Sequence, residues 1–159
     1  MRHIIACLVE NRAGVLAHVA GLFSSRGFNI ESLSVSPTEN EAVSRMTLVT
    51  SGDDAVLEQI RKQLRKLIPV LKVNDFSGQK YVERDLMLIK VAAPAAKRTE
   101  LMGLIDVFRA KVVDVTQNDM VIEVSGPNAK IEALMDLLSP YGIKEVARTG
   151  CVAMLRSRQ

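Results

Sequence analysis

Residues 2–16 read R-H-I-I-A-C-L-V-E-N-R-A-G-V-L, and this stretch decides the fold of the first half of the chain. Its first eight residues have the length of a strand and contain the apolar run I-I-A-C-L-V, and a turn containing Asn11 and Gly14 follows. The next apolar residues have the spacing of one face of an amphipathic helix: Val15, Leu16, Val19, Leu22 and Phe23. A strand therefore leads into a helix through a very short connection.

The rest of the first half continues in the same alternation. Gly27 ends the helix, as glycine often does after a helix C-terminus. Strands are predicted at 29–36 and 42–50, and Asp53 is a suitable N-cap for a second helix. A last strand at 70–76 closes the unit, so the order of elements is βαββαβ.

The same order recurs in the second half, beginning with the strand D-L-M-L-I-K-V-A at 85–92. A helix, a hairpin across 117–119, a helix opened by Gly126-Pro127-Asn128 and a final strand at 143–155 follow. An antiparallel sheet with two helices on one face accommodates each unit. The sequence therefore predicts an α+β protein of two tandem ferredoxin-like βαββαβ domains.

The expected domain boundaries follow from this repeat. Residues 1–77 form the first domain, 78–84 a linker and 85–159 the second domain. The first strand is apolar on both faces. Side chains alternate along a strand, so Ile4 and Ala6 lie on one face and Ile5 and Cys7 on the other. Helices cover only one face of the sheet, so more protein is expected against the other face or a neighbouring edge strand. It is either the second domain or a second copy of the chain, joined edge to edge in a homodimer, and we favour the homodimer.

Composition and charge disfavour nucleic-acid binding. The chain is 48% hydrophobic and 25% charged, which is typical of a folded globular protein. Basic and acidic residues number 9 and 8 in residues 1–76 and 12 and 10 in the remainder, so no strongly basic face is expected. Aromatic residues make up 4%, and the predicted central strands lack the exposed rings of RNA-recognition domains.

Both cysteines, Cys7 and Cys151, lie in apolar runs. They are expected to be buried free thiols in a reducing compartment. No secretory signal pattern and no apolar run of about 20 residues is visible. The sequence therefore predicts a cytoplasmic protein.

No catalytic constellation can be assembled from the sequence. His3 and His18 have no neighbouring nucleophile, no phosphate-binding glycine loop is present, and no residues have the spacing of metal ligands. We therefore expect neither catalytic residues nor a metal site.

The stretch E-N-R-A-G allows two interpretations. A helix N-terminus carries free N–H groups and partial positive charge that attract a carboxylate, Gly14 leaves room for a ligand, and the Asn11 amide can donate and accept. Alternatively, Asn11 caps the helix and Gly14 relieves backbone strain. The residues alone leave both interpretations open.

N-R-A-G-V-L, followed by a helix and G-F-N-I-E-S-L, resembles the amino-acid-binding motif of ACT domains, which are ferredoxin-like modules. Four further segments, which extend through the expected linker and second domain, resemble the small regulatory subunits of acetolactate synthase (acetohydroxyacid synthase). These segments are S-R-M-T-L-V, E-Q-I-R-K-Q-L-R-K-L-I-P-V-L-K-V, V-E-R-D-L-M-L-I-K-V and E-V-A-R-T-G-C-V-A-M. The resemblance spans almost the whole chain.

This resemblance implies a non-catalytic subunit in valine, leucine and isoleucine biosynthesis. Such subunits activate a separate catalytic large subunit and make it sensitive to feedback inhibition, usually by valine. Thiamine diphosphate, Mg²⁺ and FAD belong to the large subunit, so no cofactor is expected in this chain. Which branched-chain amino acid is preferred stays open.

The resemblance also implies an effector site at the interface of an ACT dimer. One side is lined by Asn11, Ala13, Gly14, Val15 and Leu16, and the other by Asn29 and Ile30 of the partner subunit. The second domain has A-P-A-A-K-R-T-E-L where the motif should stand, so no amino-acid site is predicted there. The surface around Arg148, Thr149 and Arg156 is a candidate for docking the large subunit.

Three alternatives remain at this point. Another tandem-ACT amino-acid-sensing regulator would share the first motif but has no reason to share the linker and C-terminal segments. A small enzyme of ferredoxin-like fold would need a polar cluster on the open face of a sheet. A nucleic-acid-binding module would require a salt-dependent interaction.

Overall fold

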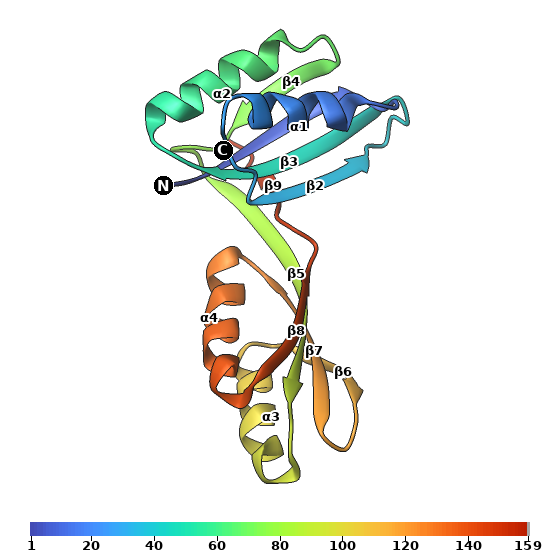
Figure 1. Ribbon diagram of the computed structural model, residues 1–159, viewed down its shortest axis with the longest axis vertical. Helices are drawn as coiled ribbons and strands as arrows, with labels where there is room; N and C mark the ends of the chain where they lie inside the picture. The colour runs from blue at the N-terminus through green and yellow to red at the C-terminus, as the bar shows by residue number, and fades with distance from the viewer. Residues whose placement is uncertain (159) are drawn as a thin grey trace. The chain divides into compact units, whose positions relative to one another are not determined.

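The computed structural model describes residues 1–158 and divides into two compact units (Figure 1). The first unit contains Met1–Val82 together with residues 151–158, and the second contains Glu83–Gly150. Two peptide connections therefore join the units, one at 82/83 and the other at 150/151.

The first unit has the predicted βαββαβ order. Its four-stranded antiparallel sheet has the strand order β2-β3-β1-β4, so β1 lies in the interior and pairs with β3 and β4. Helices α1 and α2 lie over one face of this sheet (Figure 1). The elements are β1 (Arg2–Glu10), α1 (Val15–Ser25), β2 (Ser32–Pro37), β3 (Val43–Ser51), α2 (Asp54–Lys66) and β4 (Val70–Asp75).

The second unit repeats this topology with the strand order β6-β7-β5-β8, which confirms the prediction of two ferredoxin-like α+β units. Short 3₁₀ turns precede α3 and follow α4. The elements are β5 (Tyr81–Ala92), η1 (Ala95–Lys97), α3 (Arg98–Val107), β6 (Lys111–Val115), β7 (Asp119–Gly126), α4 (Asn128–Leu138), η2 (Ser139–Tyr141) and β8 (Ile143–Arg148).

Each unit has its own apolar core between sheet and helices. In the first, Ile5, Phe23 and Leu64 are among the fully buried side chains that β1, α1 and α2 contribute. Asp53 caps α2 as predicted, because its carboxylate accepts a hydrogen bond from the Val56 N–H. The periodic apolar positions thus decide which face of each helix is buried.

The C-terminal segment departs from the expected domain boundaries. The single strand predicted at 143–155 is broken into β8 and β9 (Val152–Leu155) by a turn at Gly150, whose φ is +87°. Strand β9 pairs with β5 and belongs to the first unit, although it was expected in the second domain. Strand β5 begins at Tyr81, inside the expected linker 78–84.

Strand β9 covers the second face of β1. Ala153 of β9 and Cys151, which directly precedes β9, form a buried cluster with Ile4 and Ala6 of β1. Phe76 completes this cluster, and its ring stacks on Tyr81 with 5.5 Å between centroids. We expected a second domain or a second copy at this face. Residues 151–155 of the same chain, which were expected in the second domain, fill it, so this face gives no argument for a dimer.

None of the helices formed by residues 1–158 is both long enough and apolar enough to span a membrane.

The alternation of side chains along β9 predicts that two neighbouring substitutions change the stability by very different amounts. Ala153 is 6% exposed beneath β1, whereas Met154 is 66% exposed. Ala153→Asp places a carboxylate in an apolar layer and should lower the free energy of unfolding by about 3 kcal/mol or more. Met154→Asp should change it by less than about 0.5 kcal/mol. Urea unfolding followed by circular dichroism measures both; equal effects would contradict the packing of β9.

Burial protects the thiol of Cys7. Its removal from water raises the pKa from 9.0 to about 12, and the positive charge of Arg45 only partly opposes this shift. Because the folded-state pKa is raised, the resulting stabilisation is complete below the unfolded-state value and declines as the pH rises from 9.0 towards 12. At a pH of about 8.5, an aromatic disulfide reagent should leave the native protein unmodified and react with two thiols after unfolding. Rapid reaction of the native protein would contradict the burial of both cysteines.

Candidate functional site

The turn between β1 and α1 is anchored at Asn11. The Asn11 backbone N–H donates to the Ala42 carbonyl oxygen at 2.8 Å, and its side-chain amide donates to the Glu41 carbonyl oxygen, also at 2.8 Å. The N-cap of α1 is Gly14, and no side chain caps this helix. The interpretation of Asn11 as a helix cap is therefore wrong: Asn11 fastens the turn to the loop before β3.

Gly14 fits both roles that the sequence suggested for it, the relief of backbone strain and the provision of space for a ligand. Its φ of +86° and ψ of −11° lie in the left-handed region, where residues other than glycine are strained. A Cβ at this position would have no heavy atom within 4 Å, so the space beside the backbone is open. Glycine is required here by the turn, and it also leaves the start of α1 accessible.

The N-terminus of α1 is suited to an anion. Its first turn has neither a side-chain cap nor an acidic residue. The first N–H groups of a helix have no partner within the helix and carry partial positive charge. A carboxylate placed beside Gly14 would accept hydrogen bonds from these groups without displacing a side chain.

The predicted residues around this turn differ in what they can contribute. Ala13 is exposed, and Leu16 is 46% exposed on the outer side of the first helical turn. Val15 is 3% exposed and packs in the core of the first unit. Val15 therefore offers a ligand only its backbone N–H, whereas Leu16 offers an apolar side chain.

Asn29 and Ile30 lie beyond the other end of α1. Asn29 is exposed, and its carbonyl oxygen accepts a hydrogen bond from Thr50 Oγ1 at 2.9 Å. Ile30 is half-buried against the first core. The 11 residues of α1 rise by about 16 Å. One chain therefore keeps the two halves of the predicted site apart, and only a second chain could bring them together.

The residues that hold this site were not predicted. Glu41 and Ala42 anchor Asn11 across 30 residues of sequence, and Thr50 anchors Asn29 across 21. No local pattern identifies these partners, because strand register alone brings them together.

The corresponding turn of the second unit is built differently. After Ala93 and Pro94 the chain forms the 3₁₀ turn η1, and no glycine precedes α3. The Arg98 guanidinium donates to the carbonyl oxygens of Ala93 (2.9 Å) and Thr116, which ties the first residue of α3 to this turn. That the second unit lacks an amino-acid site stays a prediction.

Within residues 1–158, no group of three or more His, Cys, Asp and Glu side chains is placed to hold a metal ion. What the first unit presents, at two separate places, is backbone N–H groups beside an apolar side chain and an exposed amide. Backbone N–H groups can bind a carboxylate, and an amide oxygen can bind an ammonium group.

Family models and related sequences match both units. Residues 5–72 match the family described as AHAS small subunit-like ACT domain, and residues 84–157 match the family described as small subunit of acetolactate synthase. A probable acetolactate synthase small subunit from Archaeoglobus fulgidus is 55% identical over 159 residues, covering 100% of this chain and 99% of that protein. The acetolactate synthase small subunit of Bacillus subtilis is 51% identical over 161 residues, covering 100% and 93%.

A solved structure agrees with these matches. The crystal structure of the acetolactate synthase small subunit from Thermotoga maritima superposes with a TM-score of 0.89 at 40% identity, covering 100% of this chain and 99% of that chain. Sequence, fold and the Asn-x-x-Gly turn thus lead to one conclusion: the chain belongs to the acetolactate synthase small-subunit family, and its first unit is an ACT domain.

Proposed function

We propose that this chain is the non-catalytic regulatory subunit of acetolactate synthase in the biosynthesis of valine, leucine and isoleucine. It activates the thiamine-diphosphate-dependent catalytic large subunit and confers feedback inhibition by valine or another branched-chain amino acid. The observation that carries the effector site is the uncapped N-terminus of α1 beside Gly14, open on the side where a Cβ would stand. The family match over residues 84–157 favours this function over another tandem-ACT regulator.

The effector site requires a homodimer in this proposal. Within residues 1–158, strand β2 lies at the edge of its sheet, where its strand partner is β3. Joining the sheets of two copies edge to edge would extend the sheet from one chain into the other. It would also supply Asn29 and Ile30 of the partner subunit to a ligand held at Gly14 of the first chain.

The chemistry of the two halves matches an aliphatic amino acid. The carboxylate binds the N–H groups of Gly14 to Leu16, and the ammonium binds the amide oxygen of Asn29 of the partner subunit. The branched side chain packs against Leu16 and Ile30 of the partner subunit, which contributes roughly 1.5–3 kcal/mol. A coupling of about 1–3 kcal/mol to the large subunit is enough for regulation.

The remaining elements of the proposal concern partners and location. Thiamine diphosphate, Mg²⁺ and FAD are held by the large subunit, and this chain carries no cofactor. The protein acts in the cytoplasm, where it binds neither nucleic acid nor a membrane.

Titration calorimetry with L-valine tests the proposed site directly. We expect saturable binding to the purified chain, with no more than one ligand per ACT unit. L-Leucine is the control for side-chain shape and D-valine for stereochemistry, and D-valine should not bind because its ammonium and side chain exchange places. The same ligands are then added to the complex with the large subunit, whose activity should fall with L-valine. Absence of both binding and inhibition with every branched-chain amino acid would contradict the proposal.

Gly14→Asp tests the carboxylate end of the site. The new carboxylate would stand close to that of the ligand, and at about 4 Å and an effective dielectric constant of about 20 the repulsion is about 4 kcal/mol. We therefore expect L-valine affinity to fall by at least about a hundredfold, measured by calorimetry and by inhibition of the holoenzyme.

Gly78→Asp is the matched control. Gly78 also has a positive φ, +70°, and open space around a Cβ, but it lies far along the sequence from α1. Both variants should therefore show the same modest loss of stability, while only Gly14→Asp loses L-valine binding. Normal inhibition in Gly14→Asp would place the effector elsewhere.

A further inference from the structure

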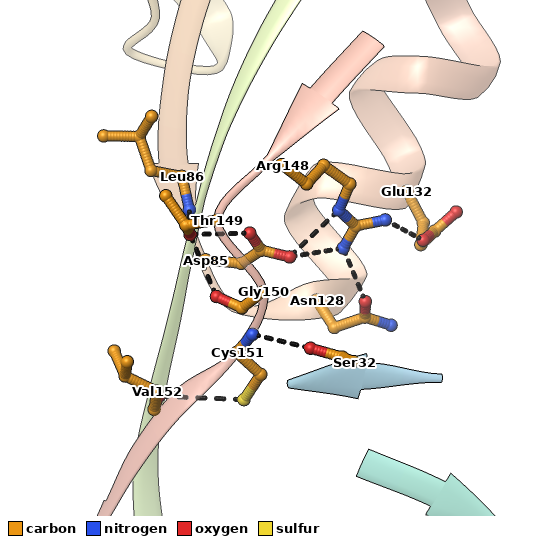
Figure 2. A network of polar contacts seen from close by, with 10 residues as sticks. All are labelled: Ser32, Asp85, Leu86, Asn128, Glu132, Arg148, Thr149, Gly150, Cys151 and Val152. Atoms are coloured by element: carbon orange, nitrogen blue, oxygen red, sulfur yellow. Dashed lines mark hydrogen bonds and ion pairs between the residues drawn. The ribbon is translucent and has the colours of Figure 1, made fainter. Parts of the chain in front are cut away.

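The segment 148–151 carries the chain from the second unit back to the first, and polar contacts hold it at both ends (Figure 2). Between those contacts lies only Gly150, with its left-handed backbone. The segment is therefore short, tethered on each side, and able to pass a displacement from one end to the other.

The end in the second unit is held by Asp85, which is 6% exposed. Its carboxylate accepts from Arg148 Nε at 2.9 Å and Nη2 at 2.6 Å, and from Thr149 Oγ1 at 3.2 Å. Arg148 also contacts Glu132 (2.8 Å) and Asn128 (3.0 Å) on α4. Burial works to lower the pKa of Arg148, but the hydrogen bonds to Glu132 and Asp85 outweigh it and raise the pKa, so the guanidinium stays charged.

The backbone of the same residues is paired as well. The Thr149 N–H donates to the Leu86 carbonyl oxygen at 3.0 Å, and the Leu86 N–H donates to Thr149 Oγ1 at 3.1 Å. Thr149 thus cannot move without breaking bonds to β5.

The end in the first unit is held by Ser32. The Cys151 N–H donates to Ser32 Oγ at 2.9 Å, and Cys151 is 2% exposed. Further along β9, Arg45 Nη2 donates to the Ala153 carbonyl oxygen at 2.6 Å. The Ser32 bond therefore fixes the residue that directly precedes β9.

Ser32 is two residues from the Asn29–Ile30 half of the proposed effector site. This short stretch rests on β3, because the Asn29 carbonyl oxygen accepts from Thr50 Oγ1 at 2.9 Å and the Glu31 N–H donates to the Val49 carbonyl oxygen at 2.8 Å. A ligand that shifts Asn29 and Ile30 therefore shifts the start of β2, where the Ser32 hydroxyl is located.

We infer that the hydrogen bond from the Cys151 amide to the Ser32 hydroxyl passes effector occupancy from Asn29 and Ile30 to segment 148–151, making Ser32 a positioning residue for regulation. This inference rests on the proposed function, since it assumes that an amino acid binds at Asn29 and Ile30. Leaving a buried N–H without an acceptor is costly, so Cys151 follows Ser32. The displacement then reaches Thr149 across Gly150.

The test compares Ser32→Ala with Ser32→Thr, which retains a hydroxyl, and with Ser36→Ala, which makes the same change on β2 at an exposed position. The full-length chain is used alone for calorimetry with L-valine and together with the large subunit for inhibition. Hydrogen–deuterium exchange of residues 148–153 is measured with and without L-valine.

We expect Ser32→Ala to bind L-valine with little change in affinity. The factor by which saturating L-valine slows the holoenzyme should fall towards one, from a value on the order of ten. L-Valine should alter exchange at 148–153 in the wild type but not in Ser32→Ala. Ser32→Thr should restore both responses, and Ser36→Ala should behave as the wild type.

Four results would overturn the inference. Full inhibition and a retained exchange response in Ser32→Ala would show that the bond is only structural. Loss of L-valine binding itself would place Ser32 in the site rather than behind it. A wild-type protein that neither binds nor responds to L-valine would contradict the proposed function as well as this inference. Failure of the inference alone is recognised because the wild type then still binds L-valine and is inhibited by it. If Ser32→Ala does not fold, unchanged wild-type exchange at 148–153 on adding L-valine overturns the inference.

Discussion

Burial of both faces of β1 is the constraint on which the first unit depends. Ile5, Cys7 and Val9 point into the core beneath the two helices, while Ile4 and Ala6 point the other way. Successive side chains alternate between the two faces of a strand, and both sets are apolar in β1, so this strand requires an apolar layer on each face. Helices supply the first layer, and β9 supplies the second. The C-terminal strand is therefore held in the first unit by the same hydrophobic burial that stabilises the sheet.

The geometry of α1 explains why we propose an effector site that two chains share. Gly14 stands at one end of the helix and Asn29 beyond the other. The turn before Gly14 is fastened by the bond from the Asn11 amide to the Glu41 carbonyl oxygen, and Asn29 is fastened by the bond from Thr50. The open backbone at Gly14 and the exposed amide of Asn29 cannot meet within one chain. A single chain thus presents the two halves of the proposed site separately, and in our proposal the association of two chains brings them together.

Much of the fold could be predicted because its information is local. Apolar spacing predicted α1 to α4, Asp53 was identified as the cap of α2, and the repeat predicted two ferredoxin-like units. The turn at Gly14 was recognised, but the role of Asn11 was not settled by its type. Asparagine is favoured both at helix caps and in other side-chain-to-backbone bonds, and only the position of the Glu41 carbonyl oxygen decides between them.

The sequence by itself determined the elements, their order, the buried helix faces and the glycine turn, since these depend on residues a few positions apart. Only the tertiary structure decided which unit the C-terminal strand joins. The bonds that fix it connect Ser32 with Cys151 and Arg45 with Ala153, across 119 and 108 residues. An apolar alternation such as that of β9 shows that one face will be buried, but not against what. That choice rests on which distant surface remains uncovered, here the second face of β1.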